Sequence, residues 1–68
     1  MGEEDRVISV GVDIGKRIHE AAFLSEDGSP ARRSLRFASD RSGLESLCEA
    51  LAGLGAPVQV ALEASGHY

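Results

Sequence analysis

Short runs of apolar residues, separated by glycine and charged residues, predict strands over much of the chain. Residues 7–14 (VISVGVDI) are rich in β-branched side chains and too short for a typical helix, which favours a buried strand. Bulky side chains alternate there with small or polar ones, so one face of that strand is expected to be apolar. Residues 18–24 predict a second strand, and residues 30–37 predict a third, with Leu35 and Phe37 facing inward.

The signals that follow predict a hairpin and then a helix. The Asp-Gly pair at 27–28 is a strong hairpin signal between the second and third strands. Ser39 or Asp40 can cap the helix with a side-chain oxygen, and a capping box from Ser42 and Glu45 would start it later.

Leucines that recur every three or four residues form one apolar stripe, which is typical of an amphipathic helix. The stripe consists of Leu44, Leu47, Leu51 and Leu54, with Cys48 beside it as a small core residue. Gly55 and Pro57 are expected to end the helix. Residues 58–63 (VQVALE) alternate between apolar and other positions and predict a fourth strand.

The resulting order is β-β-β-α-β, an α/β arrangement. Hairpin links make the first three strands antiparallel, and a right-handed crossover through the helix makes the fourth parallel to another strand. The free side of the first strand is the natural place for it. The predicted sheet order is therefore 3-2-1-4, with strands 1 and 4 parallel and adjacent.

Composition narrows the class of protein. The chain has 68 residues, a single cysteine and no apolar run near the roughly 18 residues of a membrane-spanning helix. One thiol and no Cys/His cluster fit a cytoplasmic protein without disulfides or structural zinc. Seven Lys+Arg against eleven Asp+Glu argue against a free-standing nucleic-acid binder. A chain this short is marginally stable alone, so a partner chain is expected.

Two carboxylates are the main chemical candidates. Asp13 and Glu63 lie towards the ends of the first and fourth strands, on the less bulky face of each. Ligands of open α/β sheets usually bind at the carboxyl ends of parallel strands. Oxygen ligands without Cys or His indicate Mg²⁺ or Mn²⁺. Alternatively, one carboxylate caps the loop or pairs with Lys16.

The glycines beside Asp13 suggest a competing interpretation. Gly11 and Gly15 could let the backbone cradle a phosphate, but no helix follows, so neither the dinucleotide fingerprint nor the P-loop is satisfied. Lys16 and Arg17 could contact a nucleic-acid backbone or simply form a solvated turn.

Other polar residues have structural explanations. Arg32, Arg33 and Arg36 form the basic cluster, with Arg32 and Arg36 expected to face outward, and arginines on an edge strand also discourage aggregation. His19 is expected to be packed or hydrogen-bonded rather than a ligand. No Ser/His/Asp arrangement supports nucleophilic catalysis.

Several segments together resemble one family. They are VGVDIGK at 10–16, His19 with Glu-Ala-Ala, the Glu-Asp-Gly turn at 26–28, the Gly43-Leu44 helix and LEASGHY at 62–68. They are similar to the N-terminal part of the DEDD transposases of the insertion-sequence "one-ten" family, recombinases guided by a bridge RNA. This resemblance implies an RNase H-like, RuvC-type fold. It also implies that Asp13 and Glu63 are the first two of four catalytic acids, which bind divalent metal for phosphodiester chemistry during DNA transposition.

The family's third and fourth acids and its serine nucleophile lie further downstream. Residues 7–68 are therefore expected to be an incomplete N-terminal part of the domain, inactive alone, behind a flexible acidic segment at 1–6. Ser65 does not inherit the nucleophile's role. His67 and Tyr68 could line a nucleic-acid site. The resemblance implies DNA and guide RNA as partners of the full-length protein, and the exposed edge at 58–63 predicts a homodimer.

Two other functions stay open at this point. A strand with Asp-x-Gly, a hairpin and an Asp-Gly turn also resemble the first elements of sugar kinases of the actin/Hsp70 superfamily, which contact nucleotide phosphate. A small interaction module without chemistry is the third possibility. It would require Asp13 and Glu63 to point in different directions.

Overall fold

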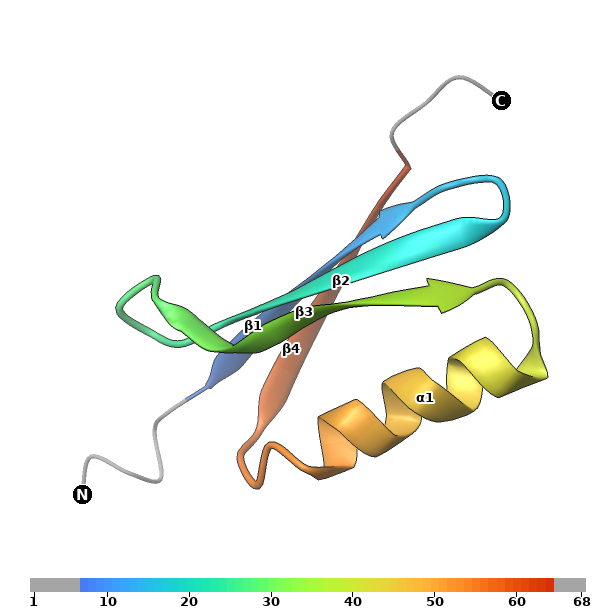
Figure 1. Ribbon diagram of the computed structural model, residues 1–68. Helices are drawn as coiled ribbons and strands as arrows, with labels where there is room; N and C mark the ends of the chain where they lie inside the picture. The colour runs from blue at the N-terminus through green and yellow to red at the C-terminus, as the bar shows by residue number, and fades with distance from the viewer. Residues whose placement is uncertain (1–6, 65–68) are drawn as a thin grey trace.

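Four strands and one helix follow in the predicted order (Figure 1). The computed structural model describes residues 7–64. The elements are β1 (Ile8–Ile14), β2 (Ile18–Leu24), β3 (Pro30–Ala38), α1 (Arg41–Ala52) and β4 (Val58–Ala64). The expectations for residues 1–6, and for Ser65, His67 and Tyr68, lie outside the described residues.

The sheet has the predicted order β3-β2-β1-β4. β2 is antiparallel to both β1 and β3, whereas β1 and β4 are parallel neighbours. α1 lies alongside β3 on one side of the sheet and carries the chain back to the start of β4 (Figure 1). The α/β, RNase H-like order expected from the sequence is confirmed. The two hairpins pair β1, β2 and β3, and the crossover through α1 brings β4 to the free side of β1.

One face of the sheet, here called the inner face, carries the core. Its buried side chains are Val10, Val12, Ala21, Phe23 and Phe37. α1 packs against them through the half-buried Leu47, Ala50 and Leu51, and Leu54 follows just after the helix. The alternation in β1 thus has the predicted direction, with Val10 and Val12 inside and Asp13 on the opposite, outer face.

The start of α1 is fixed by a cap and by a close approach. Asp40 is the N-cap, and its Oδ1 accepts a hydrogen bond from the Gly43 N–H at 2.8 Å. Gly43 is buried because the first turn of α1 lies directly against the backbone of Ala38 at the end of β3. Of the two predicted starts, the earlier one is correct.

The apolar stripe of α1 is narrower than the leucine spacing predicts. Leu44 is 55% exposed and Cys48 is also exposed, so the prediction of a core cysteine is wrong. The helix ends at Ala52 with Gly53 as C-cap, earlier than expected, and Gly55 takes φ +65° in the turn that leads to β4. Leu44 and Cys48 lie four residues apart on one flank of α1, which faces solvent, whereas Gly43 and Ala50 on the opposite flank are buried and half-buried.

Arg32 departs from the prediction that it faces outward. The pairing of β2 with β3 is irregular on both sides of Phe23, and Arg32 lies opposite Phe23. Its guanidinium carbon lies 5.0 Å from the centre of the Phe23 ring, a cation–π distance. Irregular residues of this kind shift the alternation of a strand, which an even count along the sequence does not detect.

β4 is an edge strand whose inner face is poorly covered. Val60 pairs with Val10 and Leu62 with Val12, so all four side chains share the inner face. Val10 and Val12 are buried, yet Val60 is 46% and Leu62 68% exposed. The core therefore continues onto β4 as an apolar surface that is open to solvent.

Candidate metal centre at the ends of β1 and β4

Asp13 and Glu63 are direct partners in the parallel pairing of β1 with β4. Paired residues on neighbouring strands share a face, and adjacent strands lie about 4.8 Å apart. Both side chains are exposed on the outer face. The predicted convergence of the two residues is confirmed, and an interaction module with diverging carboxylates is correspondingly disfavoured.

Local sequence explains this placement. Packing of Val10 and Val12 in the core forces the next residue, Asp13, onto the outer face of β1. The same in-register pairing that sets Val60 beside Val10 sets Glu63 beside Asp13 three residues later. The position of the two carboxylates is therefore determined by strand pairing rather than by a ligand.

Two adjacent carboxylates repel each other unless a proton or a cation lies between them. Their oxygens are the ligands that Mg²⁺ and Mn²⁺ prefer, and Mg²⁺ commonly binds through one or two protein carboxylates and several waters. Within residues 7–64, no three His, Cys, Asp or Glu side chains group closely enough to hold a metal ion. The donor set thus fits a hard divalent ion held by two protein ligands at most in this part of the chain.

A third carboxylate, Glu20, lies beside Asp13 on the other side and was missed by the sequence reasoning. Glu20 pairs with Asp13 on β1 and with Arg36 on β3. The Ser34 hydroxyl donates to its Oε2 at 3.3 Å, on the β3 side. Counting outward along the hairpin from the turn at residues 16–17 pairs Asp13 with Glu20. The hairpin register is therefore the sequence signal that predicts Glu20 beside Asp13.

These pairings define a cross-sheet row on the outer face, in the order Arg36, Glu20, Asp13, Glu63. Lys16 and Arg17 are exposed in the β1–β2 turn, at the same end of β1 as Asp13.

His19 lies on the inner face and away from this row. Its Nδ1 accepts a hydrogen bond from the Gly15 N–H at 3.2 Å, and its ring centre lies 5.2 Å from that of Phe37. The prediction that His19 is a packed, hydrogen-bonded residue is confirmed. Its role is to fix the turn that follows β1.

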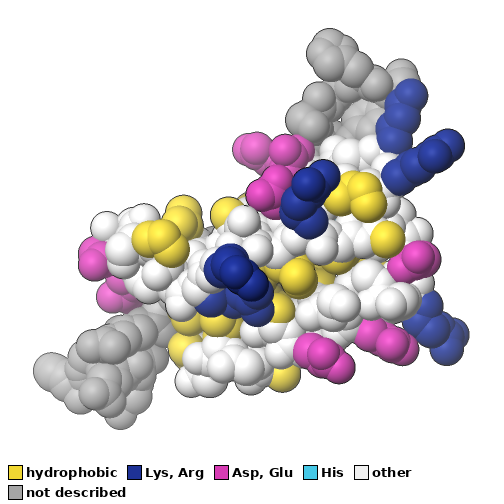
Figure 2. All heavy atoms as spheres, in the orientation of Figure 1, with side chains coloured by type: hydrophobic (Ala, Val, Ile, Leu, Met, Phe, Trp, Pro, Cys, Tyr) yellow, Lys and Arg dark blue, Asp and Glu magenta, His cyan; other side chains and the backbone are white. Residues whose placement is uncertain are grey.

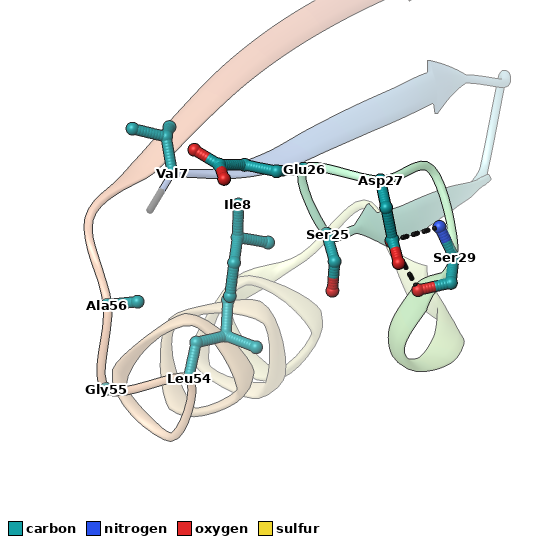
Figure 3. Close-up of a pocket in the computed structure, with 9 residues that line it drawn as sticks. All are labelled: Val7, Ile8, Ser25, Glu26, Asp27, Ser29, Leu54, Gly55 and Ala56. Atoms are coloured by element: carbon teal, nitrogen blue, oxygen red, sulfur yellow. Dashed lines mark hydrogen bonds between the residues drawn. The ribbon is translucent and has the colours of Figure 1, made fainter. Parts of the chain in front are cut away.

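A hollow of about 660 Å³ lies at the opposite end of the sheet (Figure 3). The start of β1, the β2–β3 turn and the α1–β4 turn line it. Asp27 Oδ1 accepts hydrogen bonds from the Ser29 hydroxyl at 2.7 Å and the Ser29 N–H at 3.0 Å. These bonds lower the pKa of Asp27, the side-chain bond most. The Asp27 carboxylate is thus engaged within the β2–β3 turn, and its role beside this hollow is structural.

Comparison with known protein families finds a match over most of the chain. A family model described as Transposase (DEDD_Tnp_IS110) matches residues 10–68. No curated protein and no solved structure gives a significant match. Within residues 7–64, no helix is long and apolar enough to cross a membrane.

Proposed function

Because the chain belongs to the DEDD_Tnp_IS110 family of transposases, we propose that Asp13 and Glu63 are the first two metal-binding acids of a DNA-recombining active site. The observation that carries the proposal is their direct pairing across β1 and β4. The family match favours a transposase over a sugar kinase, whose resemblance rested on the first half of the chain alone.

The carboxylates would hold Mg²⁺ or Mn²⁺ on the outer face of the sheet. Such an ion supplies Lewis-acid activation of a phosphodiester and stabilises the oxygens that attack and leave. The chain's own contribution is to fix two oxygen ligands side by side on paired strands, so that little reorganisation is needed when the ion binds. Lys16 and Arg17, in the turn at the same end of β1, would contact the DNA backbone.

We further propose that residues 7–68 form part of a larger catalytic domain. Two acids are half of the set that the family resemblance implies, and two-metal phosphoryl transfer needs ligands on both ions. The remaining acids, the serine nucleophile and the guide-RNA contacts belong to the full-length protein in this proposal, with His67 and Tyr68 near the DNA. The 68-residue chain should leave supercoiled plasmid intact in Mg²⁺. Nicking that Asp13→Asn abolishes would contradict this.

A second copy of the chain is the proposed cover for β4. The free edge of β4 offers backbone N–H and C=O groups for pairing, and Val58, Val60 and Leu62 expose apolar surface beside it. Introducing a charge by Leu62→Glu should shift a dimer to monomers in sedimentation velocity. A parent chain that stays monomeric at high concentration would contradict a homodimer.

Thermal unfolding with and without Mg²⁺ tests the metal centre. Without metal, Asp13→Asn removes the charge that lies between Glu20 and Glu63 and should raise the melting temperature. With Mg²⁺, the parent should gain stability because the ion binds the folded state, and Asp13→Asn and Glu63→Gln should not. Glu45→Gln, the same charge change on exposed α1, is the matched control and should keep the full Mg²⁺ effect. An equal Mg²⁺ effect in all variants would contradict the proposal.

A further inference from the structure

Basic side chains in the described part of the chain gather around β3, although the chain carries a net charge of −4. The six are Lys16 and Arg17 in the β1–β2 turn, Arg32, Arg33 and Arg36 on β3, and Arg41 at the start of α1. The Ser39 N–H donates to the Arg17 carbonyl at 2.9 Å, which holds the β1–β2 turn against the end of β3. Figure 2 shows Lys and Arg side chains over β3 and this turn.

Arg36 is distinguished from the other basic residues by its register. It pairs with Glu20, which pairs with Asp13, so Arg36 lies in the same cross-sheet row as the two proposed metal ligands. Two strand spacings of about 4.8 Å separate β3 from β1, so their backbones lie roughly 10 Å apart. Arg36 is exposed, and no hydrogen bond described for residues 7–64 uses its guanidinium.

On the outer face, the positions beside this row on β2, β1 and β4 are occupied by small residues. Beside the row, the outer face carries Gly11 paired with both Ala22 and Ala61. All three are exposed, and a Cβ added at Gly11 would meet nothing within 4 Å. A polymer backbone can therefore cross the strands close to the sheet without displacing a bulky side chain.

We propose that Arg36 binds a backbone phosphate of the DNA strand whose neighbouring phosphodiester lies at Asp13 and Glu63. This rests on the proposed function. A guanidinium matches a phosphate with two parallel hydrogen bonds, which fixes position as well as supplying charge. Arg36 is then a substrate-positioning residue that sets where along the strand the metal centre acts.

The carboxylate of Glu20 opposes the binding of a phosphate at Arg36. Glu20 lies between Asp13 and Arg36, and its carboxylate is hydrogen-bonded to Ser34 on the β3 side. A negative charge in that position repels the DNA phosphates unless a cation compensates it. Removing it should therefore strengthen DNA binding, opposite to the effect of removing Arg36.

The test is binding of a fluorescein-labelled single-stranded DNA by fluorescence anisotropy, over a range of NaCl concentrations without divalent ions. Each phosphate contact to a single strand contributes about 0.7 to the slope of log affinity against log salt. Arg36→Gln should weaken binding and flatten that slope by about 0.7. Arg36→Lys should keep the slope, and Glu20→Gln should bind more tightly than the parent. Arg32→Gln is the matched control, because Arg32 lies on the same strand but is held over Phe23.

An unchanged slope in Arg36→Gln would overturn the inference, and so would an equal loss of slope in folded Arg32→Gln. Tighter binding of an RNA of the same sequence would overturn the assignment to DNA. The Mg²⁺-dependent melting experiment is independent of DNA, and Arg36→Gln should keep the full Mg²⁺ effect there. If Mg²⁺ does not stabilise the parent chain, but Arg36→Gln still weakens DNA binding and flattens the salt dependence, the metal centre would be contradicted and Arg36 would be supported as a phosphate ligand.

Discussion

Substitution of Gly43 by alanine should break the contact that aligns α1 with the sheet. A Cβ at this position would overlap the carbonyl oxygen of Ala38 and lie 2.7 Å from its nitrogen and 2.8 Å from its carbonyl carbon. All three atoms belong to the backbone of β3, so no side chain can rotate away. Either the first turn of α1 or the end of β3 must move.

The expected cost follows from opposing effects. Overpacking typically costs about 1–3 kcal/mol, and more where backbone must shift. Alanine gains about 1 kcal/mol over glycine in helix propensity, which offsets part of the cost. Because the overlap is with backbone atoms, we take the upper end of the overpacking range, about 3 kcal/mol, which leaves a net loss of about 2 kcal/mol. Since 1 kcal/mol shifts the melting temperature of a domain this size by about 4–8 °C, the fall should be roughly 8–16 °C.

Thermal unfolding followed by circular dichroism measures this directly. Gly11→Ala is the control, because its Cβ meets nothing within 4 Å and alanine suits a strand better than glycine. Gly11→Ala should melt at or slightly above the parent temperature. A Gly43→Ala variant that melts within about 2 °C of the parent, well inside the 4–8 °C expected per kcal/mol, would refute the close approach of α1 to β3.

Three further changes test the packing, the cap and the β2–β3 turn. Leu51→Ala removes a half-buried side chain packed on the core and should cost about 2 kcal/mol in urea unfolding. Leu44 is 55% exposed, so Leu44→Ala should cost far less. Equal losses in the two variants would contradict the observed packing of α1. Asp40→Ala removes the acceptor for the Gly43 N–H and should cost about 1 kcal/mol, with Asp40→Asn largely restoring stability. Since hydrogen bonds from Ser29 lower the pKa of Asp27 below its ordinary 3.8, the Ser29 amide resonance should shift with an apparent pKa below 3.8. The stabilisation from this pair is present above that ordinary value and is lost as the pH falls through the folded-state pKa, and an apparent pKa at or above 3.8 would contradict the bonding.

Sequence pattern was sufficient for the element order and for the positions of Asp13 and Glu63. Alternation in β1 and β4 fixes which face each residue occupies, and the crossover rule places the two strands side by side. The shift at Arg32 escaped prediction because an irregular pairing depends on two strands at once. The exposure of Cys48 was not predicted, because which side chains of a helix are buried depends on the shape of the surface that the helix packs against, and residue spacing alone gives no information about that surface.

The Glu20–Asp13–Glu63 row was accessible but overlooked. It depends on combining a hairpin register with a parallel register, and each alone pairs Asp13 with only one acid. Arg36 joined the row in the same way, through the pairing of β2 with β3. Candidate site residues in a small sheet are therefore best sought by following registers across all strands, in addition to motifs along one.

The most direct test of the central claim is a Mn²⁺ titration followed by NMR. A paramagnetic ion between Asp13 and Glu63 should broaden their amide resonances first, together with those of their close neighbours on β1 and β4. Asp27, whose carboxylate lies in the β2–β3 turn, should be unaffected at the same Mn²⁺ concentration. Asp13→Asn should abolish the selective broadening while the spectrum stays that of the folded chain. Broadening that begins elsewhere, or that persists unchanged in Asp13→Asn, would contradict a metal centre at the ends of β1 and β4.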